Sequence, residues 1–254
     1  MAWNPNIYDQ FKSERYAPFY DLLALAEPRI NLAVLDLGCG TGELTSFLAE
    51  SLPHSMVLGV DTSAEMLEKS KAFSNDRLGF EQRGIEEQLD RETSWDLIFS
   101  NAAIQWIDNH EIILPKMISC LKPEGQLLIQ MPSQNDNVLN QLLLELVQES
   151  PYKEALNDWK RQSPVLSTDE YARILFEEGG KNITVFEKIY PIVVQDASQL
   201  YDFISGSALI PYFERMSPEL QNSFALEFKK RIRYRFPKSP AFYAFKRIIL
   251  GAKF

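Results

Sequence analysis

The chain has 254 residues and a formal net charge of -9, with 35 acidic against 26 basic side chains. Hydrophobic residues make up 45% and charged residues 24%, which is ordinary for a folded globular protein. The acidic balance disfavours binding to phosphate backbones or anionic lipid, and no run of about 18 apolar residues predicts a membrane-spanning helix. We therefore expect a protein that binds neither nucleic acid nor membrane.

Cysteine and histidine are scarce. Cys39 and Cys120 form no CxxC pair, and His54 and His110 lie outside any HExxH pattern. A disulfide framework and a histidine-rich metal site are therefore not expected. The first twenty residues lack the apolar stretch of a signal peptide, and a cytoplasmic protein is predicted.

From residue 30 to residue 131, short apolar runs alternate with helical patterns. The patterns predict strands over 30–37, 55–61, 77–82, 95–101 and 126–131, helices over 43–52, 63–73 and 110–121, and a turn over 122–125. Ser63 is the expected N-cap of the second of these helices. Strand, helix and strand in repetition indicate a parallel α/β sheet with right-handed crossovers and helices on both faces.

After Pro132 the pattern changes. It predicts helices over 138–148 and 167–178, helical sequence over 197–236, and strands over 183–194 and 242–253. We expect these two strands to complete the sheet. The chain is then a single domain, 1–254, with its core over 30–132 and helical insertions over 134–165 and 196–238.

A glycine-rich turn, Asp36-Leu37-Gly38-Cys39-Gly40-Thr41-Gly42, follows the first strand and opens a helix. Glycines there allow a tight turn and a close approach of ligand to backbone. The dinucleotide fingerprint asks for a glycine or alanine where this chain has Glu43. Acids flanking the turn at Asp36 and Glu43 favour a cationic ligand over a pyrophosphate, and S-adenosylmethionine is such a ligand.

Asp61 ends the second predicted strand, where an acid can accept hydrogen bonds from both ribose hydroxyls of a nucleoside. A helix-capping role for Asp61 remains an alternative. A turn without a ligand, an NAD-binding oxidoreductase and a cofactor-binding protein without catalysis also remain open.

Asp36 to Gly42 resembles motif I of the class I S-adenosylmethionine-dependent methyltransferases. Within that class the chain is similar to the bacterial trans-aconitate 2-methyltransferases, in segments that are strong over 1–132 and weaker beyond. These segments are Trp3-Asn4-Pro5 with Tyr8, Phe11, Glu14 and Arg15, then 99–106, and then Gln130-Met131-Pro132. The resemblance implies a Rossmann-like, mostly parallel seven-stranded sheet with helical lid insertions, and S-adenosylmethionine as the cofactor.

The resemblance also implies a set of cofactor-binding residues. They are Asp36, Gly38, Cys39, Gly40 and Gly42 near the methionine end, Asp61, Thr62 and Met66 at the ribose, Ile85 near the adenine, and Asn101 and Gln105 toward the methyl-transfer site. The family often has an acid just before Ile85, where this chain has Gly84. Glu86 is the candidate replacement.

A small-molecule carboxylate similar to trans-aconitate is the implied methyl acceptor. A carboxylic acid, with an ordinary pKa of about 4, is already ionised at neutral pH and needs no base, so no catalytic residue is assigned. Positioning the reacting atoms within about 3–3.5 Å would supply the catalysis. The implied substrate-binding residues are Tyr8, Trp106, Ile210, Tyr212 and Arg233.

Ile210 stands where the family often has an arginine. A fatty or isoprenoid acid is therefore an alternative substrate, with Tyr201, Phe203, Tyr212 and Phe213 lining an apolar pocket. The basic run over 229–238 is interpreted as a solvated helix face, with anion capture and nucleic-acid binding as alternatives.

Two single residues have competing interpretations. His110 is predicted to be exposed or to cap a helix start, rather than to act as a general base. Cys39 is predicted to occupy the glycine-rich turn because its side chain is small, rather than to act as a nucleophile. The sequence predicts no oligomeric state.

Overall fold

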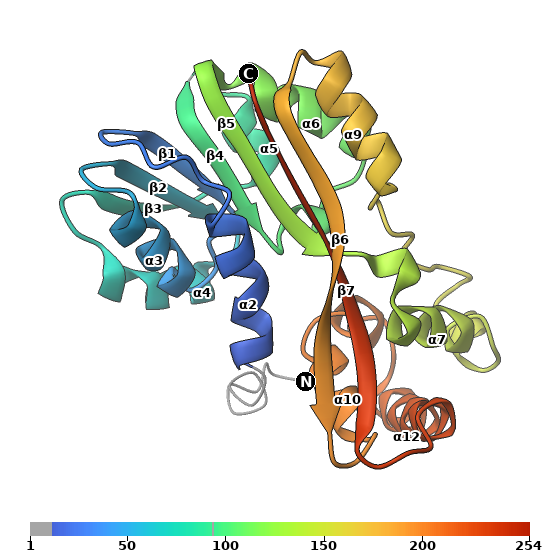
Figure 1. Cartoon of the computed structure of the whole chain (residues 1–254). Helices are drawn as coiled ribbons and strands as arrows, with labels where there is room; N and C mark the ends of the chain where they lie inside the picture. The colour runs from blue at the N-terminus through green and yellow to red at the C-terminus, as the bar shows by residue number, and fades with distance from the viewer. Residues whose placement is uncertain (1–11, 93) are drawn as a thin grey trace. The chain divides into compact units, whose positions relative to one another are not determined.

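The computed structural model describes residues 12–92 and 94–254 (Figure 1). Contacts divide these residues into two compact units, which are described separately. The sheet unit comprises Pro18–Pro132, Pro164–Lys188 and Arg247–Phe254. The helical unit comprises 12–17, Ser133–Ser163 and Ile189–Lys246. The expected single domain with two lid insertions stays a prediction.

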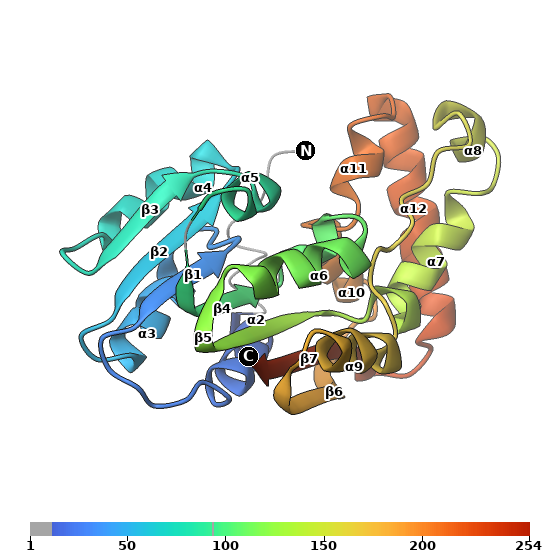
Figure 2. The ribbon, with the colours of Figure 1, turned by 90° about the horizontal axis from the view of Figure 1, so that it is seen from above.

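Seven strands form one sheet in the order β3-β2-β1-β4-β5-β7-β6 (Figures 1 and 2). They are β1 (Ala33–Leu37), β2 (Met56–Asp61), β3 (Leu78–Gln82), β4 (Trp95–Asn101), β5 (Leu121–Pro132), β6 (Lys181–Val194) and β7 (Ala241–Lys253). Neighbours among β1 to β5 are parallel, and β7 pairs antiparallel with β5. The prediction of a mostly parallel, seven-stranded α/β sheet is confirmed.

Helices connect the consecutive parallel strands: α3 (Glu43–Ser51), α4 (Ala64–Ser70), α5 (Ile85–Leu89) and α6 (His110–Ser119), with 3-10 turns η1 (Lys71–Phe73) and η2 (Ile104–Trp106). Helix α2 (Lys12–Leu23) precedes β1, and α9 (Thr168–Glu177) precedes β6. Ser63 caps α4 as predicted, because its side chain accepts a hydrogen bond from the Met66 amide. Ser167 and Glu170 form a capping box at α9.

The two faces of the sheet carry different side chains. Leu35, Ile98 and Ile129 belong to one apolar cluster with residues of α5, α6 and α9. Side chains alternate between faces along a strand, so Asp36 and Phe99, which are register partners, project from the opposite face. On that face Phe19 of α2 meets Phe99 edge to face, with ring centroids 5.6 Å apart.

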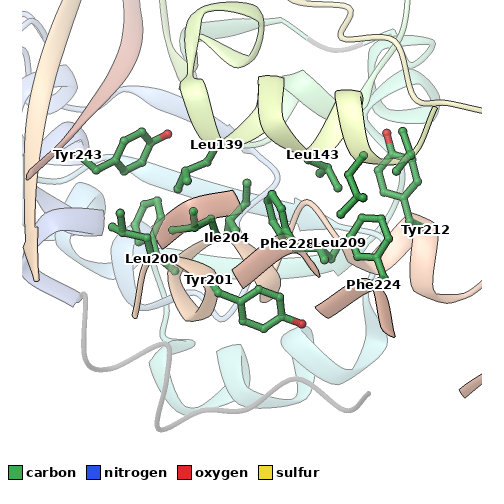
Figure 3. Close-up of a cluster of buried hydrophobic side chains, with 14 of the residues drawn as sticks. Leu139, Leu143, Leu200, Tyr201, Ile204, Leu209, Tyr212, Phe224, Phe228 and Tyr243 are labelled. Carbon is green, nitrogen blue, oxygen red and sulfur yellow. The ribbon is translucent and has the colours of Figure 1, made fainter. Parts of the chain in front are cut away.

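The helical unit has its own core (Figure 3). Its helices are α7 (Val138–Leu146), α8 (Tyr152–Ala155), α10 (Gln199–Ser205), α11 (Ile210–Phe213) and α12 (Pro218–Arg235), with a 3-10 turn η3 (Gln134–Asp136). Phe224, Phe228 and Ile232 of α12 are fully buried, as their four-residue spacing predicts. They pack in one cluster with Leu139 and Leu143 of α7.

The structure refines one sequence expectation and corrects two. The helical sequence over 197–236 is divided into three helices, and Pro211 and Pro218 lie at helix starts, where a missing amide costs least. The prediction of a turn over 122–125 is wrong, because these residues belong to β5, where the register with β4 shifts. The first strand begins at Ala33 rather than at residue 30, and Ile30 is 62% exposed.

None of the helices in the described part of the chain has the length and apolar character needed to cross a bilayer.

Candidate functional site

The glycine-rich turn packs too tightly for larger residues. Gly38 and Gly42 have φ angles of 82° and 77°, which side-chain-bearing residues rarely adopt. A Cβ at Gly38 would lie 2.1 Å from the Cβ of Ala103, and one at Gly42 would lie 2.7 Å from Cζ of Phe80. The turn is therefore held against the segment that follows β4, with its backbone at the carboxyl ends of β1 and β4.

Asp61 fixes this turn to the end of β2. Its Oδ2 accepts a hydrogen bond from the Gly40 amide at 2.9 Å, and its Oδ1 accepts one from the Ser63 amide at 2.8 Å. Each carboxylate oxygen can accept a second hydrogen bond. Asp61 can thus shape the turn and still accept hydroxyl groups from a ligand.

Asp36 is a buried acid, 4% exposed, at the foot of the turn. Burial raises the pKa of Asp36 to about 7; the hydrogen bond from Thr45 opposes this rise, and the charge of Asp61 adds to it. The Thr45 hydroxyl donates that bond at 2.6 Å. A cationic ligand beside Asp36 would favour its ionised form.

Cys39 is also buried, and burial raises the pKa of its thiol, with Asp36 and Asp61 adding to the rise. A Cβ at Gly59 would lie 2.8 Å from the Cβ of Cys39. The small Cys39 side chain therefore fills the space that Gly59 leaves, and the thiol stays protonated and unreactive.

The end of β4 and the segment after it place amide side chains near the turn. The Oδ1 of Asn101 is buried and has no hydrogen-bond partner among the described residues. Gln105, 4% exposed, donates from Nε2 to the Ala102 carbonyl at 2.7 Å. Trp106 is 38% exposed.

The polar side chains Asp36 and Asn101 form a row across the sheet, and the strand register extends this row to Gln130 of β5. Asn101 and Gln130 are partners in the β4–β5 pair, so their side chains share a face of the sheet with Asp36. Gln130 is fully buried, and its Oε1 accepts a hydrogen bond from Nη1 of Arg247 at 2.7 Å. Arg247 is 6% exposed and lies opposite Pro132 in the β5–β7 register.

Sequence reasoning assigned no role to Gln130 or Arg247. One sequence signal could have identified Arg247. It is a charged residue within the mostly apolar sequence of β7, directly before the buried Ile248.

The predicted ribose and adenine residues lie beside the turn. A Cβ at Gly40 would be 3.7 Å from the Met66 sulfur, and one at Gly84 would be 3.8 Å from Cγ2 of Thr62. Ile85 is 8% exposed at the start of α5, and Glu86 beside it is exposed. The structure therefore brings the described cofactor-binding candidates together at the carboxyl ends of β1, β2 and β4, while their roles stay predictions.

The substrate-binding candidates are placed differently. Tyr8 lies outside the described residues, and Ile210, Tyr212 and Arg233 belong to the helical unit. Ile210 is 41% exposed, whereas Tyr212 is buried and accepts a hydrogen bond from the Arg161 amide at 3.2 Å. Their part in substrate binding stays a prediction.

Of the residues named above as a possible pocket lining, Tyr201 and Tyr212 are buried in the core of the helical unit (Figure 3). Phe203 and Phe213 belong to the same buried cluster. A role for them in binding an apolar acid also stays a prediction.

The basic run on α12 forms ion pairs. Arg231 donates to both carboxylate oxygens of Glu149 and, through Nε, to Glu227 at 3.2 Å. Arg233 lies 4.0 Å from Asp196, and both side chains are more than half exposed. These contacts favour the interpretation as a solvated helix face.

His110 is completely buried, so its predicted exposure is wrong. Its ring nitrogens contact the Tyr171 hydroxyl at 2.5 Å and the Ile104 carbonyl at 2.9 Å. Burial lowers the pKa of His110, which keeps the ring neutral. Since a carbonyl only accepts, Nε2 donates to Ile104 and Nδ1 accepts from Tyr171. His110 therefore joins η2 to α6 and α9.

Comparison with known proteins supports these observations. A family model described as a methyltransferase domain matches residues 29–180. The trans-aconitate 2-methyltransferase of Deinococcus radiodurans is 38% identical over 99% of this chain and 98% of its own length. The enzyme of the same name from Variovorax paradoxus is 31% identical over 93% of this chain and 91% of its own.

Solved structures share the fold. The YcgJ protein of Bacillus subtilis has a TM-score of 0.61 at 18% identity, covering 94% of this chain and 98% of that one. Phosphoethanolamine N-methyltransferase 2 of Haemonchus contortus, solved with S-adenosyl-L-methionine, has a TM-score of 0.55 at 17% identity, covering 95% of this chain and 52% of that one. With the family model and the two bacterial relatives, these findings establish that the chain belongs to the class I S-adenosylmethionine-dependent methyltransferases.

Proposed function

We propose that this methyltransferase esterifies a carboxylate oxygen of a small organic acid similar to trans-aconitate. The observation that carries the proposal is the 38% identity, over almost the full length of both chains, to an enzyme named trans-aconitate 2-methyltransferase. The proposal includes a small-molecule acceptor rather than a nucleic acid or a membrane lipid.

The residues present fit the cofactor. Gly38 and Gly42 let the turn pack closely against Ala103 and Phe80, whereas a Cβ at Gly40 would meet only the Met66 sulfur, at 3.7 Å, so a ligand has room beside the backbone there. Asp36 would compensate the positive charge of the methionine part, and Asp61 would accept hydrogen bonds from the ribose hydroxyls. Ile85 would pack near the adenine, with Glu86 next to it.

When bound, S-adenosylmethionine supplies a methyl group on a positively charged sulfur, which keeps the electron pair of the broken carbon–sulfur bond. The protein does not need to remove a proton from an acid, because a carboxylate with a pKa of about 4 is ionised at neutral pH. This agrees with the amide character of Asn101, Gln105 and Gln130. It also agrees with His110, whose two ring nitrogens are engaged within the fold.

Catalysis would then come from orientation. Correct positioning of two reactants can contribute about 7–11 kcal/mol to lowering a barrier. Asn101 and Gln105 are well suited to hold reactants, since one lies at the end of β4 and the other is fixed by its bond to the Ala102 carbonyl. Buried amides orient a carboxylate without protonating it.

A fatty or isoprenoid acid is the second candidate, and Ile210 favours it because a half-exposed apolar residue stands where an arginine would attract a polycarboxylate. The two candidates differ in the charge of the acceptor.

A panel of acids separates them. We would incubate the purified chain with methyl-labelled S-adenosylmethionine and trans-aconitate, other di- and tricarboxylates, a fatty acid or an isoprenoid acid. Mass spectrometry would then detect methyl esters. We expect the highest kcat/KM with trans-aconitate or a related polycarboxylate. Esterification of the fatty or isoprenoid acid alone would favour the second candidate, and no ester with any acid would refute carboxylate methylation.

A further inference from the structure

The pair formed by β5 and β7 places a cation at the carboxyl end of the parallel sheet. Arg247 is 6% exposed and lies opposite Pro132, the last residue of β5. Its Nη1 donates to Oε1 of Gln130 at 2.7 Å, and Gln130 is itself fully buried. Gln130, a neutral side chain with little freedom to move, is thus one partner of the guanidinium group.

The sheet register connects this cation to the candidate methyl-transfer site. Asp36 pairs with Phe99, and Asn101, two residues further along β4, pairs with Gln130. Side chains two residues apart project from the same face, so Asp36, Asn101 and Gln130 share one face and Gln130 reaches Arg247 on it. The opposite face carries the apolar cluster that includes Ile129 and Ile248.

Two buried polar atoms on this row indicate a polar ligand. The Oδ1 of Asn101 and the Nε2 of Gln130 have no hydrogen-bond partner within the described part of the chain. The two residues are direct neighbours across β4 and β5. Buried polar groups in folded proteins almost always have a partner, and a ligand with oxygen atoms could accept from Gln130 beside the arginine.

We propose that Arg247 binds a carboxylate of the methyl acceptor that does not itself react, with Gln130 holding the guanidinium group in place. This role rests on the proposed function. Arginine matches a carboxylate with two parallel hydrogen bonds, which occupy electron pairs on both oxygens. Such a carboxylate is a poor nucleophile, so the methyl group goes to another carboxylate of the same molecule. The acceptor class is therefore a di- or tricarboxylate.

The arrangement also accounts for Ile210. The cation for the second carboxylate comes from β7 in the sheet unit, so an arginine at position 210 is not required. Arg233, which stands in an exposed ion pair with Asp196, is not needed for this purpose either.

The test compares two acceptors in three variants. The acceptors are a dicarboxylate esterified by the wild type and an analogue in which a methyl group replaces its second carboxylate. The variants are Arg247→Gln, Arg247→Lys and the control Arg77→Gln. Arg77 is an exposed arginine that precedes β3 at the amino edge of the sheet, so its replacement changes the net charge equally.

We expect Arg247→Gln to lower kcat/KM for the dicarboxylate roughly a hundredfold, mainly through KM, and to change the analogue less than about threefold. Arg247→Lys keeps the charge without the paired geometry and should lose about tenfold. Affinity for S-adenosylhomocysteine should stay unchanged in both, which also checks folding; if Arg247→Gln does not fold, the lysine variant alone decides. Arg77→Gln should behave as the wild type.

The outcomes separate the two claims. If the wild type esterifies no acid, the proposed function is wrong and the role of Arg247 is overturned with it. If the wild type esterifies the dicarboxylate and the folded Arg247 variants keep the wild-type preference over the analogue, the role of Arg247 is overturned and the proposed function stands. An equal loss for both acceptors would show that Arg247 is structural only, which also overturns its role.

Discussion

Replacing Asp61 with asparagine tests the link between the shape of the glycine-rich turn and cofactor binding. In the structure one carboxylate oxygen accepts from the Gly40 amide and the other from the Ser63 amide. An amide side chain has a single acceptor oxygen, so one backbone N–H loses its partner. The variant also removes the charged acceptor that we propose for the ribose hydroxyls.

The expected magnitude follows from these contacts. Each hydrogen bond to a charged group contributes about 1.5–3 kcal/mol. The lost backbone contact should therefore lower the free energy of unfolding by about that amount. Loss of a charged bond to the ribose should weaken cofactor binding by at least about tenfold, since 1.4 kcal/mol corresponds to a factor of ten.

Ser63→Ala is the matched control. The Ser63 side chain accepts from the Met66 amide at 3.3 Å and caps α4, and losing such a cap costs about 1 kcal/mol. Calorimetric titration with S-adenosylhomocysteine and thermal unfolding would be measured for the wild type and both variants. Only Asp61→Asn should weaken binding. If Asp61→Asn loses stability but keeps the wild-type Kd, the acid serves only to cap the helix and shape the turn.

Three other perturbations have expected outcomes. The pKa of Asp36 is about 7 in the fold against 3.8 ordinarily, so the folded state holds an extra proton between these values and the free energy of unfolding falls as pH rises through that range. Asp36→Asn should flatten this dependence in unfolding titrations and raise stability above pH 7 by up to about 4 kcal/mol. A pH-independent difference between the two proteins would contradict the raised pKa. Gly38→Ala adds a Cβ 2.1 Å from that of Ala103, whereas Gly179→Ala has a similar φ of 85° and meets nothing within 4 Å. Thermal unfolding should show the larger loss for Gly38→Ala, by at least about 2 kcal/mol, and equal losses would mean that backbone strain alone matters. Arg231→Gln should leave KM for a polycarboxylate within about twofold, because Arg231 already forms ion pairs with Glu149 and Glu227. The same change should lower the free energy of unfolding by at most about 1 kcal/mol. A large rise in KM would instead assign anion capture to the basic run.

Local sequence patterns predicted the parts of the fold that depend on neighbouring residues. The strand before Gly38, the helix after Gly42 and the cap at Ser63 follow from composition and spacing within a few residues. Asp61 was singled out because it ends the second predicted strand, which follows the glycine-rich turn in the sequence. Its bond to Gly40 confirms that the two segments meet, although the sequence could not show that the acid shapes the turn.

Contacts between distant segments were missed. The predicted exposure of His110 was wrong because Tyr171, sixty-one positions away, comes to its ring. No local pattern shows what Arg247 contacts, since only the pairing of β7 with β5 brings it to Gln130. Pro123 and Gly125 resemble a turn, yet they lie within β5, between Leu121 and Gln126, which both pair with β4.

The kind of atom that receives the methyl group tests the central claim most directly. The chain would be incubated with trans-aconitate and S-adenosylmethionine labelled with ¹³C at the methyl group, and the product examined by ¹³C NMR. We expect a single methyl ester signal that disappears after alkaline hydrolysis, with release of labelled methanol. A labelled methyl group on nitrogen, sulfur or carbon, or no transfer to any carboxylic acid, would contradict carboxylate methylation by this protein.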